Sequence, residues 1–156
     1  MTLLGAIRPD DWNLSLFLHV LGAMTLVGAL VLVVVSLASA RGGDSAAALR
    51  LGYRTLLLGA IPGWIVMRAG AQWIASKEGF DDPDVEVPAW IDIGFLTSEP
   101  TLLFLIAATV CAGIAARRAR EGGRAFGGLN TAALVLVSIT LLAYVLAIWA
   151  MSTKPT

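Results

Sequence analysis

One histidine, His19, is the residue of this chain whose surroundings constrain its chemistry most. It lies within residues 14–38, a run without Asp, Glu, Lys or Arg that exceeds the roughly 20 apolar residues needed to cross about 30 Å of hydrocarbon. An imidazole needs a partner there, because an unsatisfied polar group away from water costs on the order of several kcal/mol. Three roles are open: a hydrogen-bonding strut between helices, a haem or metal ligand, and a carrier of protons.

Arg68 is a charged residue within a second apolar stretch, at a depth similar to that of His19. Gln72 follows one helical turn later on the same face, and Glu99 opens the next stretch. Arg68 either extends to the headgroups or forms a paired charge, with Glu99 as its candidate partner in an ion pair or gate. Glu99 also suits the positive N-terminal end of a helix. Tyr144 is either a packing residue or part of the same polar pocket.

The composition predicts that membrane-spanning helices carry these residues. Hydrophobic residues make up 58% of the 156 residues and charged residues 14%, whereas soluble domains carry about 25% charged residues. The mean hydropathy is +0.81, and a soluble core of this length would not bury so much apolar surface. The single cysteine, Cys111, is interpreted as a small packing residue and indicates no disulfide framework.

Four apolar stretches, separated by loops rich in glycine or charge, predict one all-α domain, an integral membrane four-helix bundle over residues 1–156. The third stretch is expected to start at a Ser-Glu-Pro sequence, with Pro100 at or near the first helical position. The predicted spans are residues 14–38, 49–75, 98–116 and 129–151, and the predicted outer loop is residues 76–98.

The distribution of charge predicts the orientation of this bundle. The first and third loops are rich in arginine, whereas the second is acidic. Because arginine-rich loops stay in the cytoplasm, both termini and the loop at 76–98 are expected outside. His19 and Arg68 would then lie about 8 and 10 Å below the outer surface, so the polar pocket is expected in the outer leaflet.

Small residues predict which faces of the first two spans meet the rest of the bundle. Small residues allow helices to approach closely in membranes, so the stripe that carries them in the first span is expected to face inward with His19. In the second span, Pro62 and the glycines near it predict a kink just below Arg68. The stripe of the first span consists of Ser15, His19, Gly22, Ala23, Leu26 and Ala29.

The segment LFLHVLGAMTLVGALV, residues 16–31, resembles the first helix of several small bacterial membrane families, in which a Leu-His pair is followed by a small residue and then a glycine. These are the copper-resistance D-type domain, the HemJ-type protoporphyrinogen oxidases and a related family of uncharacterised predicted integral membrane proteins. The resemblance implies a multi-pass protein of the bacterial cytoplasmic membrane, with His19 as an axial haem ligand. A second axial ligand would come from another chain or from Met24, Met67 or Met151.

Two classes of function follow from these observations. In the first, the bundle holds haem through His19 for redox chemistry or electron transfer, with Arg68 or Gln72 meeting a propionate and Tyr144 lining the pocket. In the second, the chain is a transport, channel or accessory subunit, with Arg68 and Glu99 as an outer gate and His19 as a structural or proton-responsive group. Whether the chain is an enzyme stays open.

The expected partners are the lipid bilayer and either further copies of the chain, as a homo-oligomer, or a larger membrane complex. Motifs for nucleotide binding, zinc proteolysis and nucleophilic hydrolysis are absent from the sequence, and it has no basic patch of the kind that binds nucleic acid. Copper transport is disfavoured because the methionines lie in different spans and form no MxxM spacing.

Overall fold

The computed structural model describes residues 13–40, 45–80, 82, 84–85, 87–122 and 127–153. Every regular element within these residues is a helix, which confirms the predicted all-α fold. The elements are α1 (Asn13–Ser39), α2 (Ser45–Thr55), the short π-helix η3 (Leu56–Ala60), α3 (Ile61–Glu78), α4 (Ala89–Arg120) and α5 (Gly128–Thr153).

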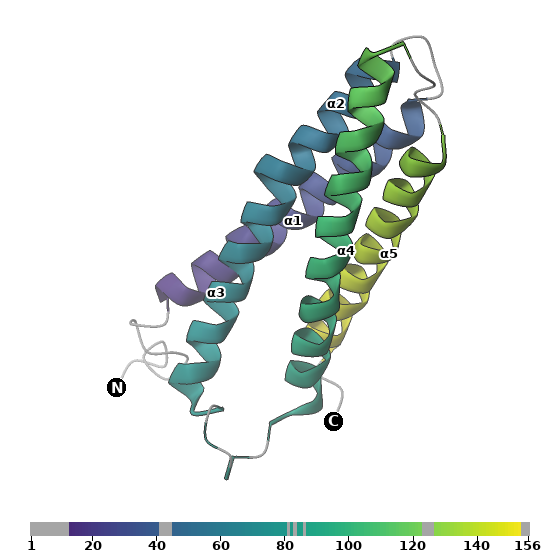
Figure 1. The fold of residues 1–156 in the computed structure, drawn as a ribbon. Helices are drawn as coiled ribbons and strands as arrows, with labels where there is room; N and C mark the ends of the chain where they lie inside the picture. Colours follow the sequence, from purple (N-terminus) through teal and green to yellow (C-terminus); the bar gives the residue numbers. More distant parts are fainter. Residues whose placement is uncertain are drawn as a thin grey trace.

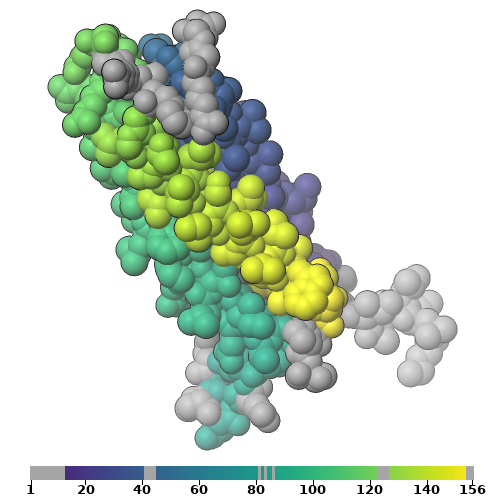
Figure 2. All heavy atoms as spheres, turned by 90° about the vertical axis from the view of Figure 1, so that its right-hand side faces the viewer, coloured from purple at the N-terminus to yellow at the C-terminus, as the bar shows by residue number. Residues whose placement is uncertain are grey.

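The helices run alternately up and down as four rods, because α2, η3 and α3 follow one another without a break (Figure 1). α1 packs mainly against α2 and α3, and α4 packs mainly against α5. Figure 2 shows α5 lying along α4 and reaching α1, which joins the two pairs. In Figure 1, α3 and α4 diverge toward the end where α3 finishes and α4 begins.

Three of the described helices, α1, α4 and α5, are long and apolar enough to cross a membrane, with hydropathies of 2.6, 1.8 and 2.5. The predicted second span, residues 49–75, is not among them. It is divided between α2, η3 and α3, and the helices α2 and α3 have 11 and 18 residues. Arg50, Arg54 and Arg68 also interrupt the apolar sequence of this rod.

A kink was predicted near Pro62, and the structure has a π-helical turn directly before this proline. The Ile61 N–H bonds to the Leu56 carbonyl, five residues earlier, and Pro62 follows at the start of α3. Proline has no N–H, and its ring clashes with the carbonyl four residues before it in a regular α-helix. A wider π turn at this point lets the rod continue through Pro62.

The predicted start of the third helix, at the Ser-Glu-Pro sequence, is wrong. α4 begins at Ala89 rather than at residue 98, and Pro100 lies in the helix interior, so the outer loop is much shorter than residues 76–98. The Thr101 hydroxyl lies 2.9 Å from the carbonyls of Thr97 and Ser98, and such side-chain bonds help a membrane helix to tolerate an internal proline. The added turns carry Trp90 and Phe95 against the interior.

Glycines bring the backbones of α1 and α3 into direct contact. A methyl group added at Gly22 would overlap the backbone of Met67, and one added at Gly63 would lie 2.9 Å from the Leu26 nitrogen. One added at Gly70 would lie 2.5 Å from the His19 nitrogen. The predicted small-residue stripe of α1 faces this contact, because four of its members are buried and two are half-buried. The buried members are Ser15, Gly22, Leu26 and Ala29.

The two ends of the bundle carry opposite charges. The end where α2 begins and α4 finishes carries described arginines, and the other end carries described carboxylates. Asp44, Asp81, Glu86, Arg41 and Arg124, which also entered the charge pattern, lie outside the described residues. The arginines are Arg50, Arg54, Arg117, Arg118 and Arg120, and the carboxylates are Glu78, Asp82, Asp84, Asp92 and Glu99.

Candidate ligand cavity

A cavity of about 340 Å³ lies between the α1–α3 pair and the α4–α5 pair, toward the acidic end of the bundle. Its walls are mostly apolar and aromatic, as in sites for small organic ligands, which commonly occupy roughly 300–1,000 Å³. Three of the predicted site residues, His19, Arg68 and Tyr144, line it, and Gln72 and Glu99 lie outside the lining. The larger apolar lining residues include Leu16, Phe80, Trp90, Phe95, Ile148 and Met151.

His19 is fixed by the α1–α3 contact. Its backbone lies against Gly70, and its Nδ1 lies 3.1 Å from the carbonyl oxygen of Met67 on α3. A carbonyl only accepts, so this bond requires Nδ1 to carry the proton. The half-buried ring therefore keeps Nε2 as its unprotonated nitrogen in the neutral state, and the ring borders the cavity. The hydrogen bond also makes His19 a strut between two helices, which was one of its three predicted roles.

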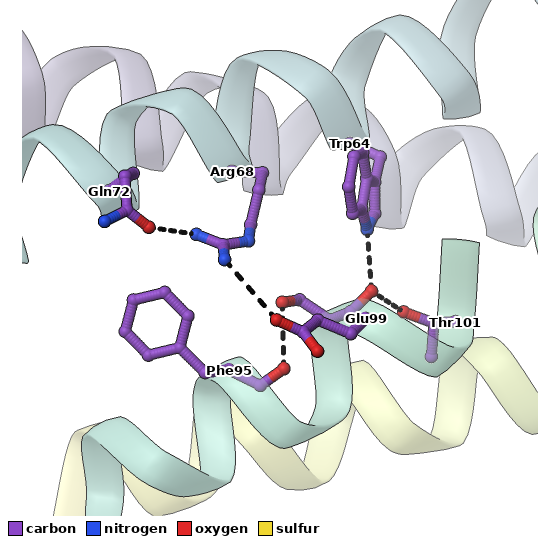
Figure 3. Close-up of polar contacts among 7 residues, drawn as sticks. Trp64, Arg68, Gln72, Phe95, Glu99 and Thr101 are labelled. Carbon is purple, nitrogen blue, oxygen red and sulfur yellow. Dashed lines mark hydrogen bonds and ion pairs between the residues drawn. The ribbon is translucent and has the colours of Figure 1, made fainter. Parts of the chain in front are cut away.

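Arg68 reaches from α3 toward α4 and contacts three side chains, one on α3 and two on α4 (Figure 3). It donates a 2.8 Å hydrogen bond to Oε1 of Gln72, and its Nη2 lies 3.7 Å from Oε1 of Glu99. The guanidinium carbon also lies 4.5 Å from the centre of the Phe95 ring. The Arg68 side chain is 22% exposed and that of Glu99 is 72% exposed, so the ion pair lies at the rim of the cavity rather than within the core.

Below the ion pair, a series of hydrogen bonds connects α3, α4 and α5. The Trp64 indole donates to the Ser98 carbonyl across 3.1 Å (Figure 3). The same carbonyl accepts a bond from the Thr101 hydroxyl, which lies 2.9 Å from the hydroxyl of Tyr144. Tyr144 is buried, so its hydroxyl has a partner where water is scarce, as a buried phenol requires. Ser98 and Tyr144, two members of this series, line the cavity.

The structure distinguishes between the methionines proposed as second ligands. Met24 is 70% exposed on the outer surface of α1. Met67 and Met151 both line the cavity. Met151 comes from α5, and its terminal methyl packs where Gly94 of α4 has no side chain. A thioether and an imidazole from two different helices therefore border the same space.

Sequence reasoning missed the contributions of Phe95 and Trp90 to the cavity and the hydrogen-bond partner of Trp64. Phe95 and Trp90 fall in the predicted outer loop, whereas they belong to the first turns of α4. Their alternation with polar residues, in the run AWIDIGF before the Ser-Glu-Pro sequence, was the available signal. The partner of Trp64 is a backbone carbonyl. Every residue has such a carbonyl, so residue types do not indicate which one accepts the bond.

The donor set limits the kinds of metal site that fit. Among the described residues, no group of three or more His, Cys, Asp or Glu side chains could hold a metal ion. Structural and catalytic ions such as Zn²⁺ need three or four protein ligands. A single imidazole in an apolar cavity instead suits a metal whose equatorial ligands come from a porphyrin.

Comparison of this chain with models of protein families, with curated proteins and with solved structures finds no match.

Proposed function

We propose that this chain is an integral membrane protein that binds haem in the cavity between its two helix pairs, with His19 as an axial ligand. The observation that carries the proposal is the His19–Met67 hydrogen bond at the wall of an apolar cavity. A histidine that ligates a metal commonly donates its other ring nitrogen to a carbonyl or carboxylate, which fixes the tautomer and the ring orientation. Nε2 of His19 is the nitrogen that this arrangement leaves for iron.

The remaining residues of the cavity suit a flat apolar group with an acidic edge. Aromatic and aliphatic side chains on four helices would contact the faces of the macrocycle, and Met151 would supply the second axial ligand from α5. Arg68 lies at the rim, where its loose 3.7 Å contact with Glu99 leaves it able to pair with a propionate carboxylate. When bound, haem would supply one-electron chemistry, which its axial ligands and the apolar surroundings would tune.

The haem proposal is tested by the absorption spectrum of the purified protein. The full chain is expressed with haem precursor and compared with His19→Ala and His19→Gln. We expect a Soret band in the wild type and its loss in both variants, with the helical circular dichroism unchanged. A colourless wild-type protein would falsify the proposal.

Met151→Leu sharpens the same test, because leucine keeps the apolar volume and removes the thioether. We expect the bound haem to keep its Soret band but to change from a six-coordinate to a five-coordinate spectrum, with one haem per chain. Met24→Leu is the matched control, since Met24 lies on the exposed face of α1. A bis-histidine spectrum at one haem per two chains would instead mean that two copies of His19 share the group.

We also propose that all four rods cross the bilayer and that the acidic end, with both termini, lies outside. The α2–η3–α3 rod covers 34 residues, from Ser45 to Glu78, which at 1.5 Å per residue exceeds the thickness of a bilayer. The arginine bias of the opposite end supports the orientation. In a Cys111→Ala background, an impermeant maleimide added to intact cells should label Asp82→Cys and miss Glu121→Cys. The reverse labelling would contradict the orientation.

A second candidate function has one observation in its favour. The Arg68–Glu99 pair and the Trp64–Ser98 bond connect α3 and α4 where these two helices diverge. A transport or accessory subunit could open the cavity by releasing these contacts, with His19 as a structural or proton-responsive group. Good purity together with the absence of a Soret band would favour this function.

A further inference from the structure

A second hollow, of about 470 Å³, lies at the other end of the bundle, between α2 and α4. Two arginines from each helix line it together with the tyrosine of α2. Its lining consists of Arg50, Tyr53, Arg54, Gly113, Ala116, Arg117 and Arg120. We refer to these seven residues as the basic pocket.

The orientation of a membrane protein does not require four arginines to line the same pocket. The positive-inside rule concerns the number of cations on the cytoplasmic side and not the direction in which they face. Arg118 lies in the same turn of α4 as Arg117 and Arg120 but does not line the pocket. All four arginines are exposed, so water weakens their mutual repulsion, and an anion bound between them would lower it further.

The described residues supply little negative charge at this point. Within the described parts of the chain, the lining contains no carboxylate, and the one ion pair of these arginines is Arg117 with Glu121, at 3.1 Å. Both of these side chains are mostly exposed, at 82% and 62%, so water screens the pair strongly.

The floor of the pocket is shaped by Gly113 and Tyr53. A methyl group added at Gly113 would lie 3.0 Å from Cε2 of the Tyr53 ring, so the ring packs against α4 where there is no side chain. This contact places a phenol hydroxyl, which can donate a hydrogen bond, among guanidinium groups. Arginine and tyrosine donors together are suited to the oxygens of a phosphate group.

We propose that the basic pocket binds the phosphate of an anionic phospholipid from the adjacent leaflet. A lipid fits better than free phosphate because exposed apolar side chains continue from the pocket along the same helices, where acyl chains can lie. Basic pockets between membrane helices on the cytoplasmic side are suited to anionic headgroups. This proposal does not depend on haem in the other cavity. The apolar residues are Leu51, Leu57, Leu58, Val110 and Ile114.

Native mass spectrometry of the full chain in neutral detergent tests the proposal. The probes are dioleoylphosphatidylglycerol, dioleoylphosphatidylcholine and inorganic phosphate. We expect retention of the anionic lipid well above that of the zwitterionic lipid, with a loss of about fivefold in affinity for each arginine removed in Arg54→Gln and Arg120→Gln. The double variant should lose about 25-fold.

Arg118→Gln is the matched control, because it removes the same charge from the same end of α4 outside the pocket. We expect it to change lipid affinity by less than about twofold. A loss in Arg118→Gln equal to that in Arg120→Gln would overturn the proposal in favour of diffuse attraction. Inorganic phosphate that displaces the lipid and binds equally tightly alone would also overturn it, because the site would then recognise the free anion. Circular dichroism confirms that each variant is folded.

Discussion

The α1–α3 contact and the α3–α4 contact lie on two sides of one helix. The first is formed mainly by backbone atoms and the second by long side chains. On one side, Gly22, Gly63 and Gly70 let backbones touch, and His19 adds one bond to a carbonyl. On the other side, α3 and α4 diverge and meet through the Trp64 and Arg68 side chains. Close backbone packing tolerates no added atom, whereas side-chain contacts can be made and broken. The cavity therefore has one fixed wall, which holds His19, and one adjustable wall.

The largest effect is expected at the backbone contact. Gly22→Ala adds a methyl group where the Met67 backbone lies, so α1 and α3 must separate, at a cost of about 1–3 kcal/mol in the free energy of unfolding. Gly28→Ala is the control on the same helix, because the space around Gly28 is open within 4 Å, and we expect it to be neutral. Unfolding with SDS in mixed micelles measures both. Equal losses would mean that the contact is not specific.

A smaller effect is expected at the indole bond. Trp64→Phe removes the N–H that donates to Ser98 but keeps an aromatic ring, and the same carbonyl still accepts a bond from Thr101. We expect a loss of about 1 kcal/mol. Trp149→Phe, on the exposed face of α5, should change the free energy of unfolding by less than half of that loss. If the two substitutions cost the same, the Trp64 bond does not hold α4 to α3.

The smallest effect is expected at the rim. The Arg68–Glu99 pair is separated by 3.7 Å and its carboxylate is 72% exposed, which is the setting of a weak surface ion pair. A double-mutant cycle with Arg68→Ala and Glu99→Gln should give a coupling energy below about 1 kcal/mol. The coupling should decrease further when NaCl is raised from about 0.05 to about 0.5 M. A coupling above about 3 kcal/mol, insensitive to salt, would show a buried pair and a rigid rim.

The sequence predicted best the ends of the helices that consist of one long apolar run. α1 and α5 begin and end within two residues of the predicted spans, because charged and glycine-rich segments flank both runs. The inward stripe of α1 was also predictable, since small residues at helical spacing suffice to mark it. Glu99 was predicted as the candidate partner of Arg68 because it opens the third stretch on the same side, and the two side chains lie 3.7 Å apart in the structure.

The remaining features depend on contacts between distant segments. The first turns of α4 contain Asp92 and precede a proline, so they resemble a loop until Trp90 and Phe95 pack against the cavity. The division of the second rod at η3 depends on how Pro62 is accommodated in three dimensions. The choice between Met24 and Met151 as a cavity residue likewise required the rotation of α1 and the end of α5.

The π turn at η3 determines which way the charge on α3 faces. A π-helical turn holds one residue more than an α-helical turn, and one residue corresponds to a rotation of about 100° around a helix axis. Removing one residue from Leu56–Ala60 would restore regular α-helix and rotate everything after it relative to α2. Trp64, Arg68 and Gln72 would then turn away from α4 while the arginines of α2 stayed where they are. The extra residue of this turn therefore gives Trp64 and Arg68 the orientation toward α4 that their contacts with Ser98 and Glu99 require.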